Sequence, residues 1–215
     1  MDRYQQVLLV VCLLLEASIL FLAIQRRKIS LCYSFFAYLT ITFVADLATA
    51  TLKMTPEEQR RFYLWSEFLQ DFVAIILILE LNPRVFKYYP RVRRSNQFIF
   101  FFAGIFFVIY HLLTPQTQQH DWWFSRPSDL HSKILQATCV VFLFMSGSIL
   151  FYRLRIPATY KYLMIGFAIS QFAAALAFAI AAAFGQNARV PVNYSQTIFF
   201  LLALIVWTRV YLADA

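Results

Sequence analysis

Seven long apolar runs, separated by short basic or proline-containing breaks, constrain this chain more than any other feature. A helix needs about 20 apolar residues to cross a hydrocarbon core about 30 Å thick, and each run meets that length. Hydrophobic residues make up 61% of the sequence and charged residues 14%, whereas about 25% of the residues in a soluble domain are charged. The sequence therefore predicts an all-α, polytopic membrane bundle and excludes a soluble fold.

The predicted spans cover most of the chain. They lie near residues 5–25, 31–52, 63–82, 97–115, 133–152, 161–184 and 194–213. Because the longest connection between them, 116–132, is too short for a folded domain, we expect residues 1–215 to form a single transmembrane domain. An odd number of crossings places the two termini on opposite sides of the bilayer.

Basic residues indicate the orientation, because Lys and Arg are enriched in cytoplasmic loops. With the N-terminus outside, the cytoplasmic side holds twelve of them: Arg26, Arg27, Lys28, Arg84, Lys87, Arg91, Arg93, Arg94, Arg153, Arg155, Lys161 and Arg209. The outer side then holds seven, diluted by five acids: Arg3, Lys53, Arg60, Arg61, Arg126, Lys133 and Arg189, with Asp2, Glu57, Glu58, Asp121 and Asp129. We therefore predict an outer N-terminus and a cytoplasmic C-terminus.

Contact with lipid, rather than with nucleic acid, explains the formal net charge of +8. The basic residues adjoin spans, and no soluble, aromatic-studded surface accompanies them. We expect them to contact anionic lipid headgroups on the cytoplasmic side, above all between Arg84 and Arg94. Cys12, Cys32 and Cys139 lie within or at the edge of spans, so we interpret them as packing residues rather than as disulfide partners.

The sixth span carries small residues at every fourth position, which allows helix backbones to approach closely. One row is Gly166, Ser170 and Ala174, and a neighbouring row is Ala173, Ala177, Ala181 and Gly185. We expect this helix to be central in the bundle, with the alternative that its small face binds a protein partner. The prolines fall in connections or at span ends, so the spans are predicted to be unbroken, unlike the broken helices of many transporters.

Five acidic residues lie within the predicted spans: Glu16, Asp46, Glu67, Asp71 and Glu80. Ionisable groups at this depth cost about 2.5–3.5 kcal/mol each on insertion and usually face the bundle interior. Glu80 lies near the cytoplasmic end, one turn before Arg84, and we expect these two side chains to pair. The other four fall in the outer half or at the midplane when depth is counted at about 1.5 Å per residue.

These four acids predict a polar pocket that opens to the outside. Glu67 and Asp71 are one turn apart and share a helix face, close to Gln70. The candidate ligand-binding residues are Glu16, Asp46, Glu67, Gln70, Asp71 and Gln171. Further polar residues at a similar depth are Gln136, Gln196 and Thr197. The alternative is that the acids only fix helix packing, either protonated or bonded to rim cations, which are Lys53, Arg60, Arg61 and Lys133.

The sequence lacks the patterns of known membrane-protein chemistry. Seven spans with an outer N-terminus are similar in architecture to the rhodopsins and the G-protein-coupled receptors, but residues 194–213 contain no lysine to bind retinal. The three histidines, His111, His120 and His131, lack the spacing of the zinc hydrolases related to ceramidases and adiponectin receptors. We expect them to be solvated residues near the outer surface. We therefore predict no cofactor and no metal, and we favour a non-enzymatic role.

One stretch carries a family resemblance. Residues 63–94, YLWSEFLQDFVAIILILELNPRVFKYYPRVRR, resemble a segment of uncharacterised seven-span bacterial membrane proteins. The resemblance covers little more than the third span and the loop after it. It implies a location in a bacterial inner membrane and no particular activity.

Three functions remain open at this point. The first is a receptor-like or sensory bundle that binds a small polar or cationic ligand in the acidic pocket and signals through a separate partner. The second is a small transporter or proton-coupled channel that uses the same carboxylates. The third is an accessory subunit that packs against a larger membrane complex through the small face of the sixth span.

Overall fold

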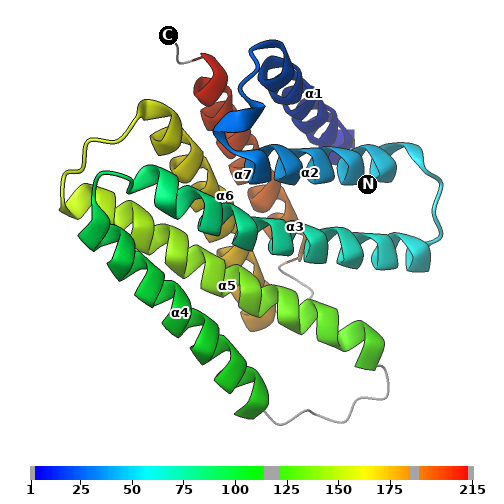
Figure 1. Ribbon diagram of the computed structural model, residues 1–215. Coiled ribbons are helices and arrows are strands. Elements are labelled where there is room, and N and C mark those ends of the chain that lie inside the picture. Colours follow the sequence, from blue (N-terminus) through cyan, green and yellow to red (C-terminus); the bar gives the residue numbers. More distant parts are fainter. Residues whose placement is uncertain (1–2, 114–121, 185–188, 213–215) are drawn as a thin grey trace.

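The structure, a computed structural model, describes residues 3–113, 122–184 and 189–212. Within these ranges the chain forms a short 3-10 helix and seven α-helices (Figure 1). Their bounds are α1 (Arg3–Gln25), η1 (Ile29–Leu31), α2 (Tyr33–Thr51), α3 (Pro56–Val85), α4 (Pro90–Leu113), α5 (Trp122–Phe151), α6 (Ala158–Phe184) and α7 (Arg189–Leu212). The prediction of an all-α fold is confirmed, and each predicted span overlaps one α-helix.

Six of the described helices, namely α1, α2, α3, α5, α6 and α7, are long and apolar enough to cross a membrane. Their outward faces carry large exposed apolar side chains, such as Leu14, Phe72 and Leu202. Helix α4 likewise exposes Phe98, Phe101 and Phe102. An apolar exterior of this extent requires a lipid solvent, so the fold is that of a multi-pass helical membrane protein.

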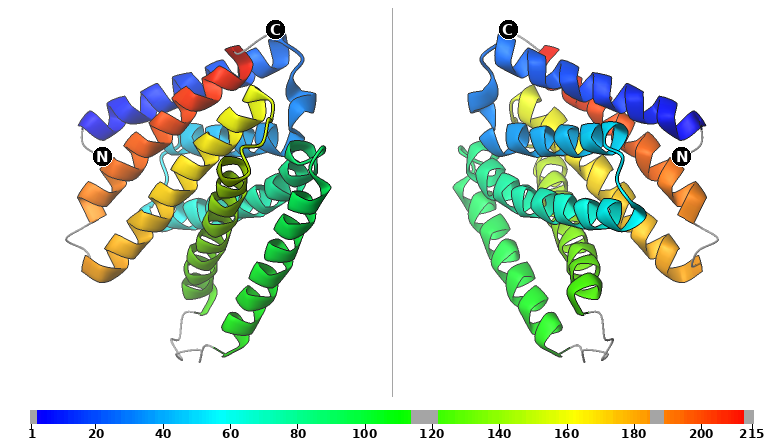
Figure 2. Two further views of the ribbon diagram at one scale, coloured as in Figure 1. Left: turned by 90° about the vertical axis from the view of Figure 1, so that its left-hand side faces the viewer. Right: turned by 90° about the vertical axis from the view of Figure 1, so that its right-hand side faces the viewer.

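The helices form a ring of six with one helix outside it. Contacts run from α1 to α2, then α3, α5, α6 and α7, and from α7 back to α1. Helix α4 lies outside the ring, where it packs mainly against α5 and touches α3 (Figures 1 and 2). The ring therefore encloses a shared interior, and α4 takes no part in lining it.

Helix α6 lies between α5 and α7 in this ring. It meets α7 at Gly166, where a Cβ atom would lie 2.2 Å from Nε1 of Trp207. The Trp207 ring is fully buried, and its Nε1 donates a hydrogen bond to the Leu163 carbonyl at 3.2 Å. At Gly166, the small face of α6 thus packs closely against α7 of the same chain, as expected for this helix. Ala181 and Gly185, from the second row of small residues, lie outside the described side chains.

Three helices, α3, α4 and α5, begin well before the predicted spans. Helix α3 begins at Pro56 because the Thr55 hydroxyl accepts from the backbone N–H of Glu58, whose carboxylate accepts from the Thr55 N–H at 2.9 Å. This reciprocal pair is a capping box. Helix α5 begins at Trp122, within the segment predicted as a connection. Pro127 and Pro83 consequently lie inside helices, near the beginning of α5 and the end of α3.

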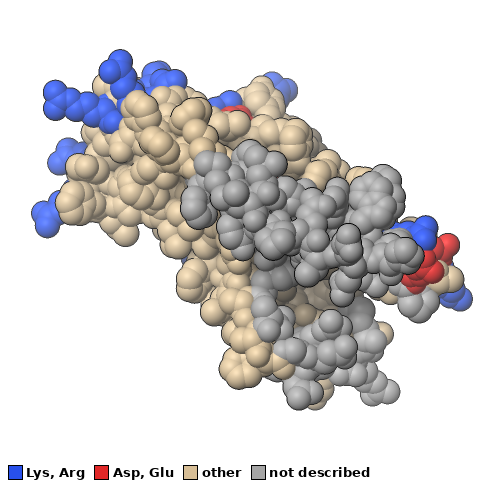
Figure 3. Space-filling model, turned by 90° about the horizontal axis from the view of Figure 1, so that it is seen from below, with Lys and Arg blue, Asp and Glu red and all other residues tan. Residues whose placement is uncertain are grey.

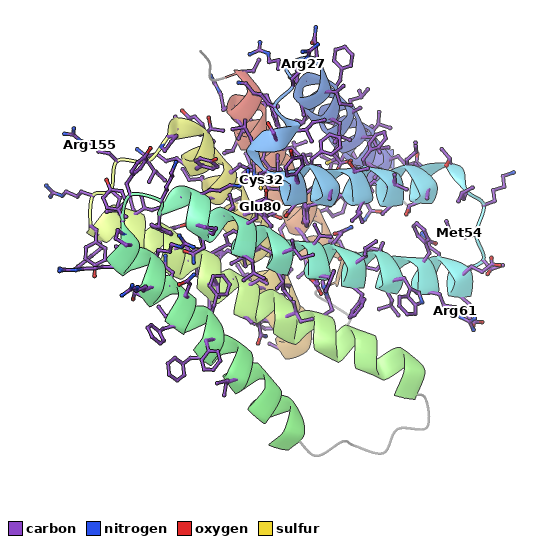
Figure 4. All side chains as sticks on the ribbon, viewed as in Figure 1. Arg27, Cys32, Met54, Arg61, Glu80 and Arg155 are labelled. Atoms are coloured by element: carbon purple, nitrogen blue, oxygen red, sulfur yellow. The ribbon has the colours of Figure 1, made fainter. Side chains whose placement is uncertain are left out.

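The connections gather at two ends of the bundle. The first, which we name the basic end, consists of residues 26–32, 86–89 and 152–157 together with the C-terminal end of α7, and Lys and Arg side chains crowd it (Figure 3). Arg27 and Arg155 lie at this end, whereas Met54 and Arg61 lie at the opposite end (Figure 4). The pattern of basic loops predicted from the sequence therefore corresponds to one face of the fold.

Candidate functional site

A cavity of about 480 Å³ lies inside the ring, and all six ring helices line it. The polar residues nearest to the end opposite the basic end are Gln5, Thr49, Gln59 and Asn193. Deeper along their helices lie Tyr38, Leu135 and Phe200. Pockets that bind small molecules are typically about 300–1,000 Å³, and combine apolar walls with a few placed polar groups. This cavity has both properties.

Helical spacing explains how two helices present their polar side chains to the cavity. On α2, Tyr38, Thr42 and Asp46 follow one another at four-residue intervals, so they lie along one face. On α3, Glu67 and Asp71 are related in the same way, as expected from the sequence. Three carboxyl groups from two neighbouring helices therefore reach one cavity.

His131 of α5 is the partner of two of these acids. Its Nδ1 lies 2.6 Å from Oδ2 of Asp71, and its Nε2 lies 3.8 Å from Oε2 of Glu67. Both ring nitrogens thus face carboxylates, and the imidazolium form donates in both directions. His131 and Asp71 are only 8% and 5% exposed, so this ion pair is held away from bulk solvent and connects α5 to α3.

The prediction that His131 is a solvated residue is wrong. The sequence predicts His131 in the connection 116–132, but α5 begins at Trp122, so His131 lies on this helix inside the bundle. The spacing of His131, Leu135, Thr138, Phe142 and Met145 follows a helical face, and all five are buried. That apolar periodicity, continued toward the N-terminus, was the signal for this residue. His120 lies outside the described residues, as does the side chain of His111.

Asp46 differs from the other two cavity acids. Its side chain is half-buried and has no hydrogen-bond or ion-pair partner within the described part of the chain. Glu67, by contrast, faces Nε2 of His131 at 3.8 Å. The cavity therefore contains one carboxyl group that no described residue compensates.

Gln171 of α6 lines the cavity, as predicted, and is 5% exposed. Its Oε1 accepts a hydrogen bond from Thr138 Oγ1 at 3.0 Å. Its Nε2 donates to no other described residue. An amide whose acceptor is occupied and whose donor is open presents a hydrogen-bond donor to whatever fills the cavity.

Glu16 is the one candidate that does not line the cavity. It is fully buried, one turn beyond Cys12, which does line it, and neither carboxyl oxygen has a hydrogen-bond partner. Burial of an unpaired ionised carboxylate is very costly, so this environment favours the neutral form of the group. Glu16 lies within electrostatic range of Asp46, and we describe it as a buried acid behind the cavity wall.

Of the remaining residues that the sequence predicts for the pocket, some line the cavity and others do not. Gln70, Gln196 and Thr197 line the cavity, whereas Gln136 is exposed on the outside of α5. Among the rim cations, Arg61 pairs with Glu57 at 2.5 Å. The side chains of Arg60 and Lys133 lie outside the described residues. For Asp71 the cationic partner is His131, which the sequence interpretation did not consider.

Glu80 pairs with Arg84 at 2.7 Å, as predicted, and it also accepts hydrogen bonds from the beginning of α2. Its carboxylate accepts from the backbone N–H groups of Tyr33 and Ser34, at 3.1 and 2.9 Å, and from the Ser34 hydroxyl. It thereby caps the N-terminus of α2 from α3, close to Cys32 (Figure 4). Glu80 is therefore a structural residue, apart from the cavity.

Among the described residues, no three His, Cys, Asp or Glu side chains converge as a metal site. Comparison with protein-family models, with curated proteins and with solved structures gave no match. The fold and the cavity together define a class: a multi-pass, all-α membrane protein with an acidic cavity enclosed by six of its helices.

Proposed function

We propose that this protein is a receptor-like bundle that binds a small cationic ligand in the acidic cavity. One observation carries the proposal: three carboxyl groups, of Asp46, Glu67 and Asp71, reach the cavity, and among the lining residues that the structure describes His131 is the one cationic side chain. For these described residues, negative charge exceeds positive charge even with His131 protonated and the acids ionised. A cation entering the cavity gains attraction that a low dielectric strengthens.

We propose further that the cavity faces the outside of a bacterial inner membrane. The positive-inside rule assigns the basic end to the cytoplasm, and the polar residues at the cavity entrance lie near the opposite end. This orientation puts the N-terminus outside and the C-terminus inside, with α4 as the seventh crossing. Anionic headgroups of the cytoplasmic leaflet then neutralise the exposed Arg91, Arg93 and Arg94.

A continuous aromatic core supports the receptor interpretation over a passive pocket. Tyr38 and Phe200 line the cavity, and both rings lie 6.3 Å from the Trp207 ring. Phe35 lies 5.1 Å from Trp207 and 6.4 Å from Tyr211. Arg26 at the basic end donates to the Tyr211 carbonyl at 2.7 Å. We propose that these contacts carry a displacement at the cavity floor toward the basic end, because close-packed side chains move together.

A thermal-unfolding screen of the purified protein against small cationic, neutral and anionic compounds tests this proposal. We expect saturable stabilisation by some cations, lost when Asp46, Glu67 and Asp71 are neutralised together and kept in Glu57→Gln, which removes an exposed acid elsewhere on α3. If no cation stabilises the protein saturably, or if the triply neutralised variant binds as well as the parent, the proposal is wrong.

Glu16 favours one second candidate, a carrier that exchanges a proton for the ligand. A neutral carboxyl close to Asp46 is suited to release a proton when a cation arrives. In proteoliposomes this function predicts cation uptake driven by a pH gradient, lost in Glu16→Gln. The absence of pH-dependent flux for every cation that binds would exclude the carrier and leave the receptor.

A further inference from the structure

We propose that the ligand is a small organic ammonium ion that also carries a hydrogen-bond acceptor. Asp46 binds the ammonium group, and the Gln171 amide donates to the acceptor. This inference rests on the proposed function, because it specifies the class of cation that the same cavity takes.

Asp46 identifies the site of the positive charge. Of the cavity acids, Asp71 and Glu67 face the imidazole of His131. Asp46 alone lines the cavity without a charged or hydrogen-bonding partner in the described part of the chain. A ligand cation therefore gains most at Asp46, where it replaces no existing ion pair.

Gln171 supplies an independent observation that points to a ligand. It is almost completely buried, yet its Nε2 donates to nothing among the described residues, while its Oε1 is held by Thr138. Because Gln171 lines the cavity, its open Nε2 is available to donate to an acceptor on the ligand, and neither an inorganic cation nor a simple alkylammonium ion supplies one.

The shape of the cavity favours an organic ion over a metal ion. A metal ion needs several ligands within about 2.0–2.6 Å of one point, and no such convergence of His, Cys, Asp and Glu exists in the described residues. The volume of about 480 Å³ is far larger than a single ion requires. Tyr38, Leu135 and Phe200 provide apolar surface for a short carbon chain, and the aromatic faces attract an ammonium group.

The test compares matched pairs of probes on the full-length protein in lipid nanodiscs at neutral pH. Ethanolamine, propanolamine and pentanolamine carry an ammonium group and an acceptor, whereas ethylamine, propylamine and pentylamine carry the ammonium group alone. Butanol and butyrate control for partition into lipid and for charge sign, and sodium, potassium and magnesium chlorides represent inorganic cations. The dissociation constant of each probe comes from saturable thermal stabilisation.

We expect at least one amino alcohol to bind about fivefold more tightly than its matched alkylamine, as one hydrogen bond provides. Asp46→Asn should weaken all amines by about 30-fold or more, because it removes the charge partner. Gln171→Met, of similar size, should abolish the difference in affinity within each pair, because the donor to the amino alcohol is lost. Glu57→Gln, the control variant, should bind every probe as the parent does.

Each alternative outcome has a distinct meaning. If inorganic cations bind saturably and no amine does, this inference is wrong while the proposed function survives. If no cation of any kind binds, the proposed function itself is wrong. Amine binding that is unchanged in Asp46→Asn overturns the assignment of Asp46. Equal affinities within every pair overturn the role of Gln171, and this comparison needs only the parent protein, so a variant that fails to fold does not prevent it.

Discussion

The imidazole Nδ1 of His131 lies 2.6 Å from Oδ2 of Asp71, inside a cavity that six helices enclose. This contact joins α5 to α3, and the other ring nitrogen faces Glu67 on the same face of α3. One side chain of α5 thus faces two acids of α3. The pair fixes two walls of the cavity and leaves Asp46 as the acid available to a ligand.

Breaking this pair should destabilise the protein. Removing one partner of a buried ion pair costs about 3–5 kcal/mol, because the other partner stays buried without compensation. His131→Leu and Asp71→Leu should each lower the free energy of unfolding by an amount in that range. The double variant should cost less than the sum, with a coupling of about 1–3 kcal/mol. Strictly additive costs in a double-mutant cycle would show that the two side chains do not interact.

Glu80→Gln should destabilise the basic end of the bundle by about 2 kcal/mol, because charge-assisted hydrogen bonds to a helix N-terminus are lost. Those bonds are the ones from Tyr33 and Ser34 of α2. The matched control is Glu57→Gln, which breaks an equally spaced but exposed pair with Arg61 and should cost about 0.5 kcal/mol or less. Hydrogen exchange at the first turn of α2 measures the effect locally; equal protection in both variants would contradict the capping role.

Gly166→Ala should lower stability, because the added Cβ would lie 2.2 Å from Nε1 and 2.6 Å from Cδ1 of Trp207. Relief of such overpacking typically costs about 1–3 kcal/mol. Gly147→Ala is the control, since nothing lies within 4 Å of the position of its Cβ. That substitution should be neutral or stabilise the helix by up to about 1 kcal/mol. Trp207 fluorescence should shift in the first variant only.

Glu16→Met should leave the protein at least as stable as the parent, or about 1–3 kcal/mol more stable, because it removes a buried carboxyl without hydrogen bonds. The opposite is expected of Asp71→Met, which strands His131. Denaturant or steric-trapping unfolding of both variants gives the comparison. A large loss of stability in Glu16→Met would mean that this carboxyl has a partner, and it would also weaken the carrier hypothesis.

The sequence predicts the helices well, because membrane helices are specified by long apolar runs that need no tertiary context. It also places Glu67, Gln70, Asp71 and Gln171 in one cavity, since helical spacing and depth determine which side chains share a face and a level. The pair Glu80–Arg84 follows from its one-turn spacing alone.

The features that the sequence does not predict depend on where each helix begins and on how each helix is rotated about its own axis. The beginning of α5 is polar and contains Pro127, so hydropathy places the start of this span too late in the chain, at residue 133, and leaves out His131. Glu16 and Gln136 have the depth of the other candidates, but their helices turn Glu16 into a packed interface and Gln136 toward the exterior. The depth of a side chain in the membrane follows from counting residues along its helix. The direction in which the side chain points depends on how neighbouring helices pack, which no single sequence shows.

The most direct test of the acidic, outward-facing cavity uses one cysteine at Ser66, a cavity-lining residue of α3. In a background with Cys12→Ala, because Cys12 also lines the cavity, intact cells or oriented vesicles are treated from outside with impermeant methanethiosulfonates. One reagent carries an ammonium group and the other a sulfonate group. The account predicts that the cationic reagent modifies Ser66→Cys at least about tenfold faster than the anionic one, as a negative local potential requires, and that Asp46→Asn reduces this ratio. Equal rates for the two reagents, or modification only from the side of the basic end, would contradict it.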